Sequence, residues 1–362
     1  MYFQKNKNVD RYHGLDALRA FAMILGIVLH SGMFYLGSDD WNTYSQTGVP
    51  DHNYIISVIF IFIHSWRMPI FFLMAGFFAR LLFYRRGAYH FTRNRFIRIV
   101  LPLIFVTSIY NFILLWGSWN NLHHLWFLYY LVYLYIFVIS FIYLMNKFHI
   151  FNRISHFFST FVDLFFNSII YFMFFILALM LSKYFSHDLG MFQQQPKNIF
   201  DFQFSFFTYC TLFFLIGWVL HRNPNFINIL SFKKTWIINI LIGIASLISY
   251  LGLLSSFGFG YTFLFIPASL STWFFSIGLI GFFHCVCPEG LNWVKYFVDA
   301  SYWIYLFHLL PVMMLGIIFL STGLHPLIAF FSNIVISTIL SVATYHGFVR
   351  YTPIGWVLNG RR

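Results

Sequence analysis

Residues 54–83 read YIISVIFIFIHSWRMPIFFLMAGFFARLLF, an apolar run that contains no acidic residue and only two cations, Arg67 and Arg80. A helix of roughly 20 apolar residues is long enough to cross the hydrocarbon core of a membrane. The run is longer than that and contains Pro69, so we expect this helix to be tilted or kinked. Similar runs recur along the chain, and they decide the fold class.

The composition of the whole chain indicates a membrane protein. Of the 362 residues, 60% are hydrophobic and only 9% are charged, whereas soluble globular domains carry about 25% charged residues. The mean hydropathy is +0.75. Soluble enzymes, disulfide-stabilised scaffolds and disordered proteins are therefore excluded, and the three cysteines are expected to be reduced. A membrane β-barrel is disfavoured as well, because its strands would alternate apolar and polar residues.

The apolar runs predict about ten membrane-spanning helices in one membrane-embedded domain, residues 1–362. We expect an all-α fold, a polytopic helix bundle in which each helix satisfies its own backbone polar groups. No separate soluble domain is expected. The runs cover residues 14–36, 54–83, 97–117, 124–145, 161–182, 204–220, 235–254, 261–283, 296–320 and 326–349.

The distribution of charge predicts the orientation of the chain. With ten spans and a cytoplasmic N-terminus, all but three of the 22 basic residues fall on the cytoplasmic side. The exceptions are Lys183 and Lys197 outside and Arg67 within the membrane. Such asymmetry is typical of the positive-inside rule, so both termini are expected to be cytoplasmic. The outer side receives five acids, Asp39, Asp40, Asp51, Asp188 and Asp201.

Polar side chains inside the first run predict a buried functional face. Charged groups in hydrocarbon cost several kcal/mol unless they face a paired or hydrated interior. Arg19 and His30 are eleven residues apart, which places them within about 20° of each other around a helix, and Asp16 lies about 60° away. The alternative interpretation is structural: Asp16 and Arg19 form an interfacial ion pair, and His30 is a hydrogen-bonded core residue.

The second run carries a cation without a nearby loop. His64 and Arg67 are three residues apart and share one helix face. Arg67 is predicted to be an anion or oxyanion clamp inside a cavity. The alternative is that Arg67 pairs with a backbone carbonyl exposed by Pro69. The segment after this run is rich in arginine, and it contacts anionic lipid or forms a basic cytoplasmic mouth for a phosphorylated ligand.

Two later segments also combine histidine with aromatic residues. His124 and Trp126 begin the fourth predicted helix, although a tryptophan there is also typical of the membrane interface. Ser301, Tyr305 and His308 share one face of the ninth predicted helix. The sequence contains no Gly-rich phosphate loop and no zinc signature, so no metal site is predicted.

The order and spacing of these motifs resemble those of the acyltransferase 3 family of bacterial membrane acyltransferases. Residues 15–19, Leu-Asp-Ala-Leu-Arg, followed by His30, are similar to the family's first motif. Residues 64–67, His-Ser-Trp-Arg, are similar to its second-helix motif, although Ala75 stands where a serine is usual. Residues 124–127 and 300–311 are similar to later motifs.

The resemblance implies an integral membrane O-acyltransferase of the bacterial inner membrane. Such an enzyme would transfer an acetyl or succinyl group from acyl-CoA to hydroxyls of a cell-envelope glycan, such as periplasmic glucan, O-antigen or exopolysaccharide. The expected partners are acyl-CoA as donor substrate, the glycan or a lipid-linked sugar, and the lipid bilayer. No tightly bound cofactor, metal or nucleic acid is expected, and the oligomeric state stays open.

The resemblance also suggests roles for the polar residues. His30 is expected to be the general base, or alternatively the acylated nucleophile. Arg19, with Asp16 beside it, and Arg67 are expected to bind coenzyme phosphates or to stabilise the oxyanion. The coenzyme mouth would comprise Arg85, Arg86, Arg93, Arg95 and Arg98, and the acceptor side would comprise His64, His124, Trp126, Ser301, Tyr305 and His308.

Two other function classes fit a polar membrane cavity. A transporter of a lipid-linked sugar or an organic anion would be favoured by discontinuous helices and internal repeats, and the sequence shows no repeat. A membrane glycosyltransferase would need acidic residues near an outer loop. Asp39 and Asp40 are the only indication of that class, and a solvated loop explains them equally well.

Overall fold

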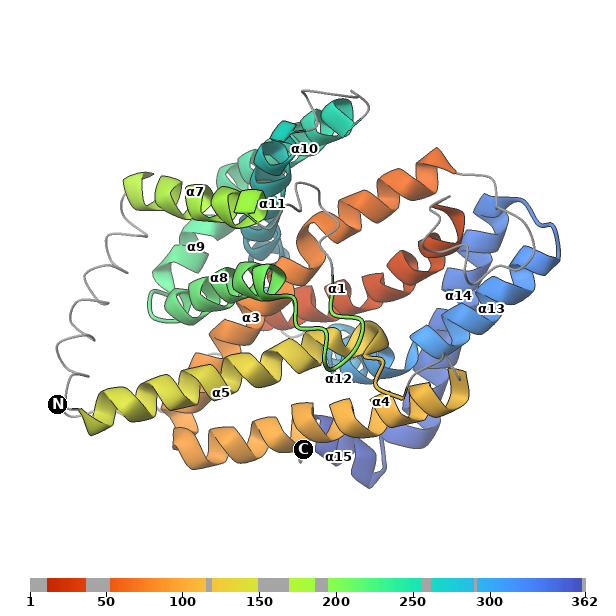
Figure 1. Cartoon of the computed structure of the whole chain (residues 1–362), viewed down its shortest axis with the longest axis horizontal. Coiled ribbons are helices and arrows are strands. Elements are labelled where there is room, and N and C mark those ends of the chain that lie inside the picture. Colours follow the sequence, from red (N-terminus) through yellow and green to blue (C-terminus); the bar gives the residue numbers. More distant parts are fainter. Residues whose placement is uncertain are drawn as a thin grey trace.

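A computed structural model describes residues 12–36, 53–114, 119–148, 169–185, 195–254, 262–289 and 292–359. Within these ranges the regular structure is helical (Figure 1), apart from one isolated bridge between Asn121 and Asn198. Six of the described helices are long and apolar enough to cross a membrane, and two bent helix pairs raise the number to eight. The all-α membrane fold is therefore as expected, while ten spans and cytoplasmic termini stay predictions.

The helices follow the predicted apolar runs. Of the predicted run 161–182, the described residues cover 169–182. Of the five outer acids, they include Asp201, and the other four lie outside the described residues. The helices are α1 (His13–Gly32), α3 (Tyr54–Arg95), α4 (Leu101–Leu114), α5 (Trp126–Lys147), α7 (Ile169–Phe185), α8 (Phe204–Leu220), α9 (Asn225–Ser231), α10 (Lys233–Leu254), α11 (Phe265–Val286), α12 (Asn292–Phe307), α13 (Leu309–Ser321), α14 (Pro326–Thr344) and α15 (Pro353–Asn359). Short 3₁₀ turns cover Met33–Tyr35 and His123–Leu125, and π-helical turns cover Phe96–Val100 and Tyr345–Val349.

A glycine separates the second and third predicted spans. The helix continues from Tyr54 through Pro69, and its one residue with non-helical dihedral angles is Gly87, at φ 78° and ψ 170°. Glycine adopts a positive φ readily because it has no Cβ. The continuous apolar segment Tyr54–Leu114 has 61 residues, about 90 Å if straight, or three times the hydrocarbon thickness. The break at Gly87 lets α3 and α4 run in different directions, as Figure 1 shows.

Pro69 ties α3 to a neighbouring helix. A proline lacks the N–H that would bond the carbonyl four residues earlier, which here belongs to Ser65. The hydroxyl of Thr272 on α11 donates a hydrogen bond of 2.7 Å to this Ser65 carbonyl oxygen. Neighbouring helices commonly satisfy backbone groups that a proline frees inside a membrane. The carbonyl freed by Pro69 is therefore bonded by α11, not by Arg67.

Glycines allow the central helices to approach closely. α1 contacts α3, α11, α12, α13 and α14, and α3 also contacts α8. A Cβ added to Gly76 would meet the carbonyl oxygen of Phe214, and one added to Gly217 would meet that of Leu73. Small residues at helix contacts are typical of membrane proteins, where close van der Waals packing drives helix association. These contacts hold α3, which carries Arg67, against α8.

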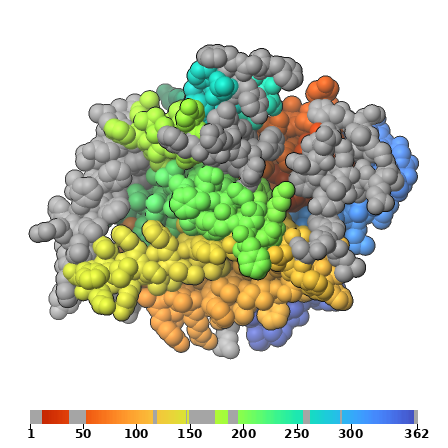
Figure 2. Space-filling model, in the orientation of Figure 1, coloured from red at the N-terminus to blue at the C-terminus, as the bar shows by residue number. Residues whose placement is uncertain are grey.

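The outer surface of the bundle is apolar. Phe105 on α4, Ile248 on α10 and Ile339 on α14 are each more than 60% exposed. Figure 2 shows one face of the molecule, on which α8 lies between α5 and α7. Many serine, threonine and asparagine side chains, together with Arg67 and His308, are instead buried. This arrangement fits a lipid surround, because an aqueous one would disfavour the exposed apolar area.

Candidate active site

Three histidines from separate segments of the chain meet inside the bundle. His30 lies near the end of α1, His124 lies in the 3₁₀ turn before α5, and His308 lies between α12 and α13. The ring centroids of His30 and His308 are 5.2 Å apart, those of His124 and His308 are 5.1 Å apart, and those of His30 and His124 are 6.2 Å apart. We call His30, His124 and His308 the histidine cluster.

The hydrogen bonds of His308 define its tautomer. Its Nδ1 lies 3.0 Å from the carbonyl oxygen of Ile304 and 2.9 Å from that of Tyr305. A carbonyl can only accept, so Nδ1 carries the proton and Nε2 keeps a lone pair. Nε2 is buried and has no hydrogen-bond partner among the described residues. Buried polar atoms are nearly always bonded, so this nitrogen is the kind of group that a bound substrate would complete.

A tyrosine from α4 stabilises the bend between α12 and α13 at His308. α12 and α13 form one apolar segment that bends by 59°, where the sequence predicted a single helix. The hydroxyl of Tyr110 lies 3.1 Å from the carbonyl oxygens of both Leu306 and Phe307, and it accepts a hydrogen bond of 3.3 Å from the N–H of Leu310. One phenol thus bonds backbone groups on both sides of the break, which would otherwise be unsatisfied in the membrane.

His124 is fixed by reciprocal bonds with Tyr305. The Nε2–H of His124 donates to the carbonyl oxygen of Tyr305 over 2.9 Å, and the Tyr305 hydroxyl donates to the carbonyl oxygen of His124 over 3.0 Å. The Nδ1 of His124 therefore keeps a lone pair, and it too is buried without a hydrogen-bond partner in the part of the chain that the structure describes. The cluster thus contains two imidazoles whose basic nitrogens are available.

Arg67 lies next to the histidine cluster, in space that is free because Gly26 has no side chain. Its side chain is 4% exposed, and its Nε donates a hydrogen bond of 3.1 Å to the carbonyl oxygen of Ala22 on α1. A Cβ on Gly26 would lie 2.9 Å from Nη2 of Arg67 and 3.2 Å from Nε2 of His308. The guanidinium and the basic imidazole nitrogen therefore converge over Gly26. A cation and a base at one point suit chemistry in which a proton leaves one oxygen and negative charge develops on another.

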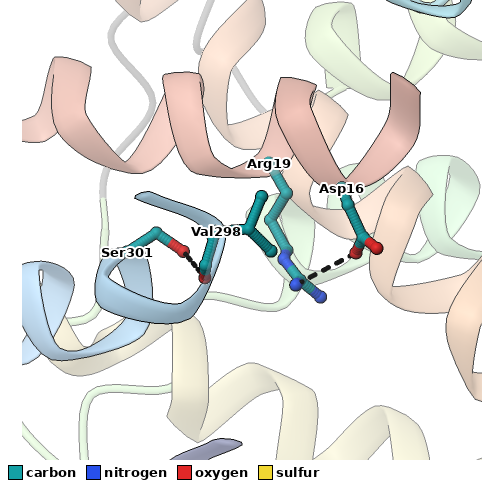
Figure 3. A network of polar contacts seen from close by, with 4 residues as sticks. All are labelled: Asp16, Arg19, Val298 and Ser301. Carbon is teal, nitrogen blue, oxygen red and sulfur yellow. Dashed lines mark hydrogen bonds and ion pairs between the residues drawn. The ribbon is translucent and has the colours of Figure 1, made fainter. Parts of the chain in front are cut away.

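Asp16 and Arg19 lie apart from the histidine cluster. Their side chains form an ion pair of 3.2 Å, and the Arg19 guanidinium lies 5.5 Å from the centroid of the Phe78 ring. Figure 3 shows Arg19 extending from α1 past Val298 of α12 toward Asp16. Eleven residues of helix separate Arg19 from His30 by about 16 Å. The polar stripe predicted on α1 therefore contributes to two separate polar sites. Asp16 and Arg19 lie at the site near the start of the helix, and His30 lies at the site near its end.

Arg19 belongs with arginines in the last turns of α3 and in the π-helical turn that follows it. Arg98 is close enough to Arg19, Arg86 and Arg95 for their charges to act on it. Arg95 donates a hydrogen bond of 3.5 Å to the carbonyl oxygen of Phe78, the residue whose ring faces Arg19. We call Arg19, Arg86, Arg95 and Arg98 the arginine cluster. Arg85, Arg86 and Arg93 are exposed, so positive charge continues from this cluster to the surface.

Three predicted site residues lie outside the histidine cluster. Trp126 is buried, and its ring packs against those of Phe72 and Phe206, with centroids 6.4 and 5.1 Å away. The Ser301 hydroxyl donates to the Val298 carbonyl of its own helix over 2.8 Å, as Figure 3 shows. His64 lines a small recess together with residues of α7, α8 and α11, and none of the three clustered histidines lines that recess.

Sequence reasoning missed two contributors to the site. Tyr110 bonds the break beside His308, yet its segment shows no polar pattern that points toward residues 306–310. Gly26 lies on the polar stripe of α1, and its position between Arg19 and His30 was the available signal. Within the described ranges, no three His, Cys, Asp or Glu side chains are arranged to hold a metal ion.

Comparisons with known proteins agree on one family. A family model described as "Acyltransferase domain" matches residues 12–346. Two curated relatives named "Glucans biosynthesis protein C", from Salmonella typhi and Salmonella typhimurium, are each 28% identical over 141 residues, or 33% of this chain and 35% of the relative. The chain thus spans about a third of the length of the curated relatives it matches. No solved structure matches the chain significantly.

Proposed function

We propose, from the premise that this chain belongs to the acyltransferase domain family matched by residues 12–346, that it is an integral membrane O-acyltransferase. The observation that carries the proposal is the convergence of Arg67 and the lone-pair nitrogen of His308 over Gly26, with His30 5.2 Å from His308. The donor would be acetyl-CoA or succinyl-CoA, and the acceptor a hydroxyl of a cell-envelope glycan. The name of the curated relatives, glucans biosynthesis protein C, favours a glucan.

The reaction needs a base and a site for developing negative charge. The acceptor oxygen attacks the thioester carbonyl, the C–S bond breaks, and coenzyme A leaves as a thiolate. His30 and His308 together supply the base, which removes the hydroxyl proton and returns it to the leaving thiolate. His30 as an acylated nucleophile is the alternative route, with the same products.

Arg67 is suited to stabilise the oxyanion. Its Nε is held by the Ala22 carbonyl, while its Nη2 lies on the Gly26 side, next to His308. A donor that is already fixed in place stabilises charge without reorganising during the reaction. Burial strengthens this interaction because water does not screen it.

The donor would enter from the arginine cluster. Guanidinium groups bind phosphate through paired, charge-assisted hydrogen bonds, and coenzyme A carries a pyrophosphate and a 3′-phosphate. The cluster lies about 16 Å along α1 from His30, a separation that an extended pantetheine arm bridges. Under the positive-inside rule this end faces the cytoplasm, so we propose a multi-pass protein of the inner membrane with both termini cytoplasmic.

The test is release of coenzyme A by the full chain in lipid nanodiscs. We expect release from acetyl-CoA or succinyl-CoA to require a glucan acceptor, and His30→Ala and His308→Ala each to lower the rate 100-fold or more, as loss of a general base does. Yield and gel-filtration profile serve as folding controls. Wild-type turnover in either variant removes that imidazole from the mechanism. Failure of the wild-type protein to use either donor rejects the proposed reaction.

A transporter of a lipid-linked sugar or an organic anion is the second candidate. The observation that favours it is the interrupted helix pair α12–α13, because transporters commonly bind substrates at discontinuous helices. The same assay separates the two classes. A transporter would move its substrate between compartments without consuming acyl-CoA.

A further inference from the structure

The turn that carries His124 begins with a strained residue. His123 has a φ of 50°, and among the described residues it is the one residue other than glycine with a positive φ. This region is uncommon for such residues, because the Cβ comes too close to the following carbonyl oxygen. A strained conformation persists only where the surrounding structure holds it. The contacts that hold His123 therefore also decide where the next residue, His124, lies.

Asn111 of α4 holds this turn through its side-chain amide. Asn111 is buried, and its Nδ2 donates hydrogen bonds of 2.7 Å to the carbonyl oxygen of Trp119 and 3.2 Å to that of Asn121. Its Oδ1 lies 2.7 Å from Nε2 of His123. An amide oxygen can only accept, so the imidazole of His123 donates. One side chain thus fixes the segment before His124 to α4 at three points.

A distant segment of the chain holds the same turn through the backbone. The N–H of Leu122 donates to the carbonyl oxygen of Lys197 over 2.9 Å, and the N–H of Ile199 donates to that of Asn120 over 3.2 Å. These two bonds flank the isolated bridge between residues 121 and 198. The backbone before His123 is therefore bonded on one side by residues 197–199 and on another by the Asn111 amide.

The carbonyl of Tyr305 connects this turn to the reacting centre. It accepts a hydrogen bond from the Nε2–H of His124 and another from the Nδ1–H of His308, each of 2.9 Å. A carbonyl oxygen has two lone pairs and can serve both donors. A shift of His124 would therefore disturb the bond that orients His308, whose Nε2 lies next to Arg67 over Gly26.

Adjacent residues of α4 support the two segments that carry these histidines. Asn111 bonds the turn before His124. Tyr110 bonds the bend at His308, and its ring centroid lies 5.3 Å from that of His124. Both side chains are buried. The end of α4 thus forms a common support for both imidazoles.

We infer that Asn111 is a positioning residue of the proposed acyl transfer. It holds His123 at its positive φ, which fixes His124 and, through the Tyr305 carbonyl, the basic nitrogen of His308. The inference rests on the proposed function. Asn111 acts through the histidines, so its loss should lower kcat. The donor's phosphates are assigned to the arginine cluster near the other end of α1, so the KM for acyl-CoA should not depend on Asn111.

The first experiment compares Asn111→Leu with the wild-type chain in nanodiscs. Asn239→Leu is the matched control, because Asn239 is also a buried asparagine but its amide donates to the Thr235 carbonyl, within the first turn of its own helix, α10. We expect Asn111→Leu to lower kcat about 100-fold, the effect of moving a catalytic group by roughly 1 Å, with the KM for acyl-CoA within twofold of wild type. Asn239→Leu should change neither value.

Two results of this comparison reject the positioning role. One is a kcat in Asn111→Leu within threefold of that in Asn239→Leu. The other is a KM for acyl-CoA that rises along with the fall in kcat, because a general loss of structure would weaken donor binding as well as turnover.

A second pair of variants decides the question if Asn111→Leu does not fold. His123→Gly and His123→Ala both remove the imidazole and its bond to Asn111, but only glycine adopts a φ of 50° without steric cost. We expect kcat in His123→Gly to be at least fivefold higher than in His123→Ala, with equal KM for acyl-CoA. Equal kcat values in the two variants overturn the inference, since the backbone conformation at residue 123 would then not affect the reaction.

The tautomer of His308 provides a measurement that needs no turnover. In protein labelled with ¹⁵N-histidine, the imidazole resonances lost in His308→Ala identify this ring, and in the wild type they should show the Nδ1–H tautomer. Asn111→Leu should shift or broaden them, and Asn239→Leu should not. Unchanged His308 resonances in Asn111→Leu overturn the inference even where acyl transfer is confirmed. A wild-type chain that transfers no acyl group rejects instead the proposed reaction.

Discussion

Gly26 is the residue that allows the base and the cation of the site to meet. Arg67 and His308 come from α3 and from the break after α12, and both reach the strip of α1 that carries no side chain at position 26. The carbonyls of Ile304 and Tyr305 fix the proton on Nδ1 of His308, and the Ala22 carbonyl fixes Arg67. The position of the base and the cation therefore depends on these three backbone carbonyls and on the absence of a side chain at Gly26.

Gly26→Ala should impair turnover without unfolding the protein. The new Cβ would lie 2.9 Å from Nη2 of Arg67 and 3.2 Å from Nε2 of His308, so at least one of them must move. Displacement of a catalytic group by about 1 Å can lower the rate roughly 100-fold, whereas alanine is the better helix former by up to about 1 kcal/mol. The measurement is coenzyme A release. The control is Gly252→Ala, where an added Cβ meets nothing within 4 Å. Equal rates in the two variants would contradict the account.

The sequence identified most of the residues that meet at the site, but it did not show that the histidine cluster and the arginine cluster are separate. The helical period places Arg19 and His30 on one face of α1. It does not show which other helices pack against each turn of that face. Arg19 consequently joins Asp16 and Arg98, while His30 joins His308. The sequence places Lys183 among the outer charges, whereas the structure buries it. Burial of a lysine at the end of an apolar run depends on helices that are distant in sequence.

At the level of helices, α3 positions the site through its contacts with α8 and α11. Pro69 frees the Ser65 carbonyl for Thr272 on α11, and Gly76 and Gly217 bring the α3 and α8 backbones together. The sequence located these helices within a few residues, because apolar length is a local property. It also predicted an interruption between residues 83 and 97, where Gly87 breaks the helix. It did not predict the bend at His308, because that bend is stabilised by Tyr110 of α4, which is distant in sequence.

Gly217→Ala should destabilise the protein. The added Cβ would meet the carbonyl oxygen of Leu73, which belongs to backbone and cannot rotate away, so α8 must shift from α3. Overpacking of this kind costs about 1–3 kcal/mol. We expect a lower Tm in thermal unfolding of the detergent-solubilised protein and a lower membrane yield, relative to Gly252→Ala. A Tm equal to that of the wild type would show that α3 and α8 are less closely packed than described.

At the level of the whole molecule, the proposed site consists of two polar clusters near opposite ends of α1. The arginine cluster lies at the start of α1, the histidine cluster lies near its end, and the apolar exterior surrounds both. Composition and charge asymmetry predicted the membrane bundle and a basic mouth, because these depend on totals and on the order of residues along the chain. The convergence of Arg67 from α3 and His308 from the junction of α12 and α13 over Gly26 could be seen only in the three-dimensional structure.

The most direct test is an experimental structure of the protein in lipid with a non-hydrolysable thioether analogue of acyl-CoA. We predict the coenzyme phosphates within hydrogen-bond distance of the arginine cluster. We predict the carbon that replaces the acyl carbonyl within about 4 Å of Arg67 Nη2 or His308 Nε2, close to the separation of reacting atoms. An acyl end that lies away from Arg67, or phosphates bound at the opposite end of α1, would contradict the account.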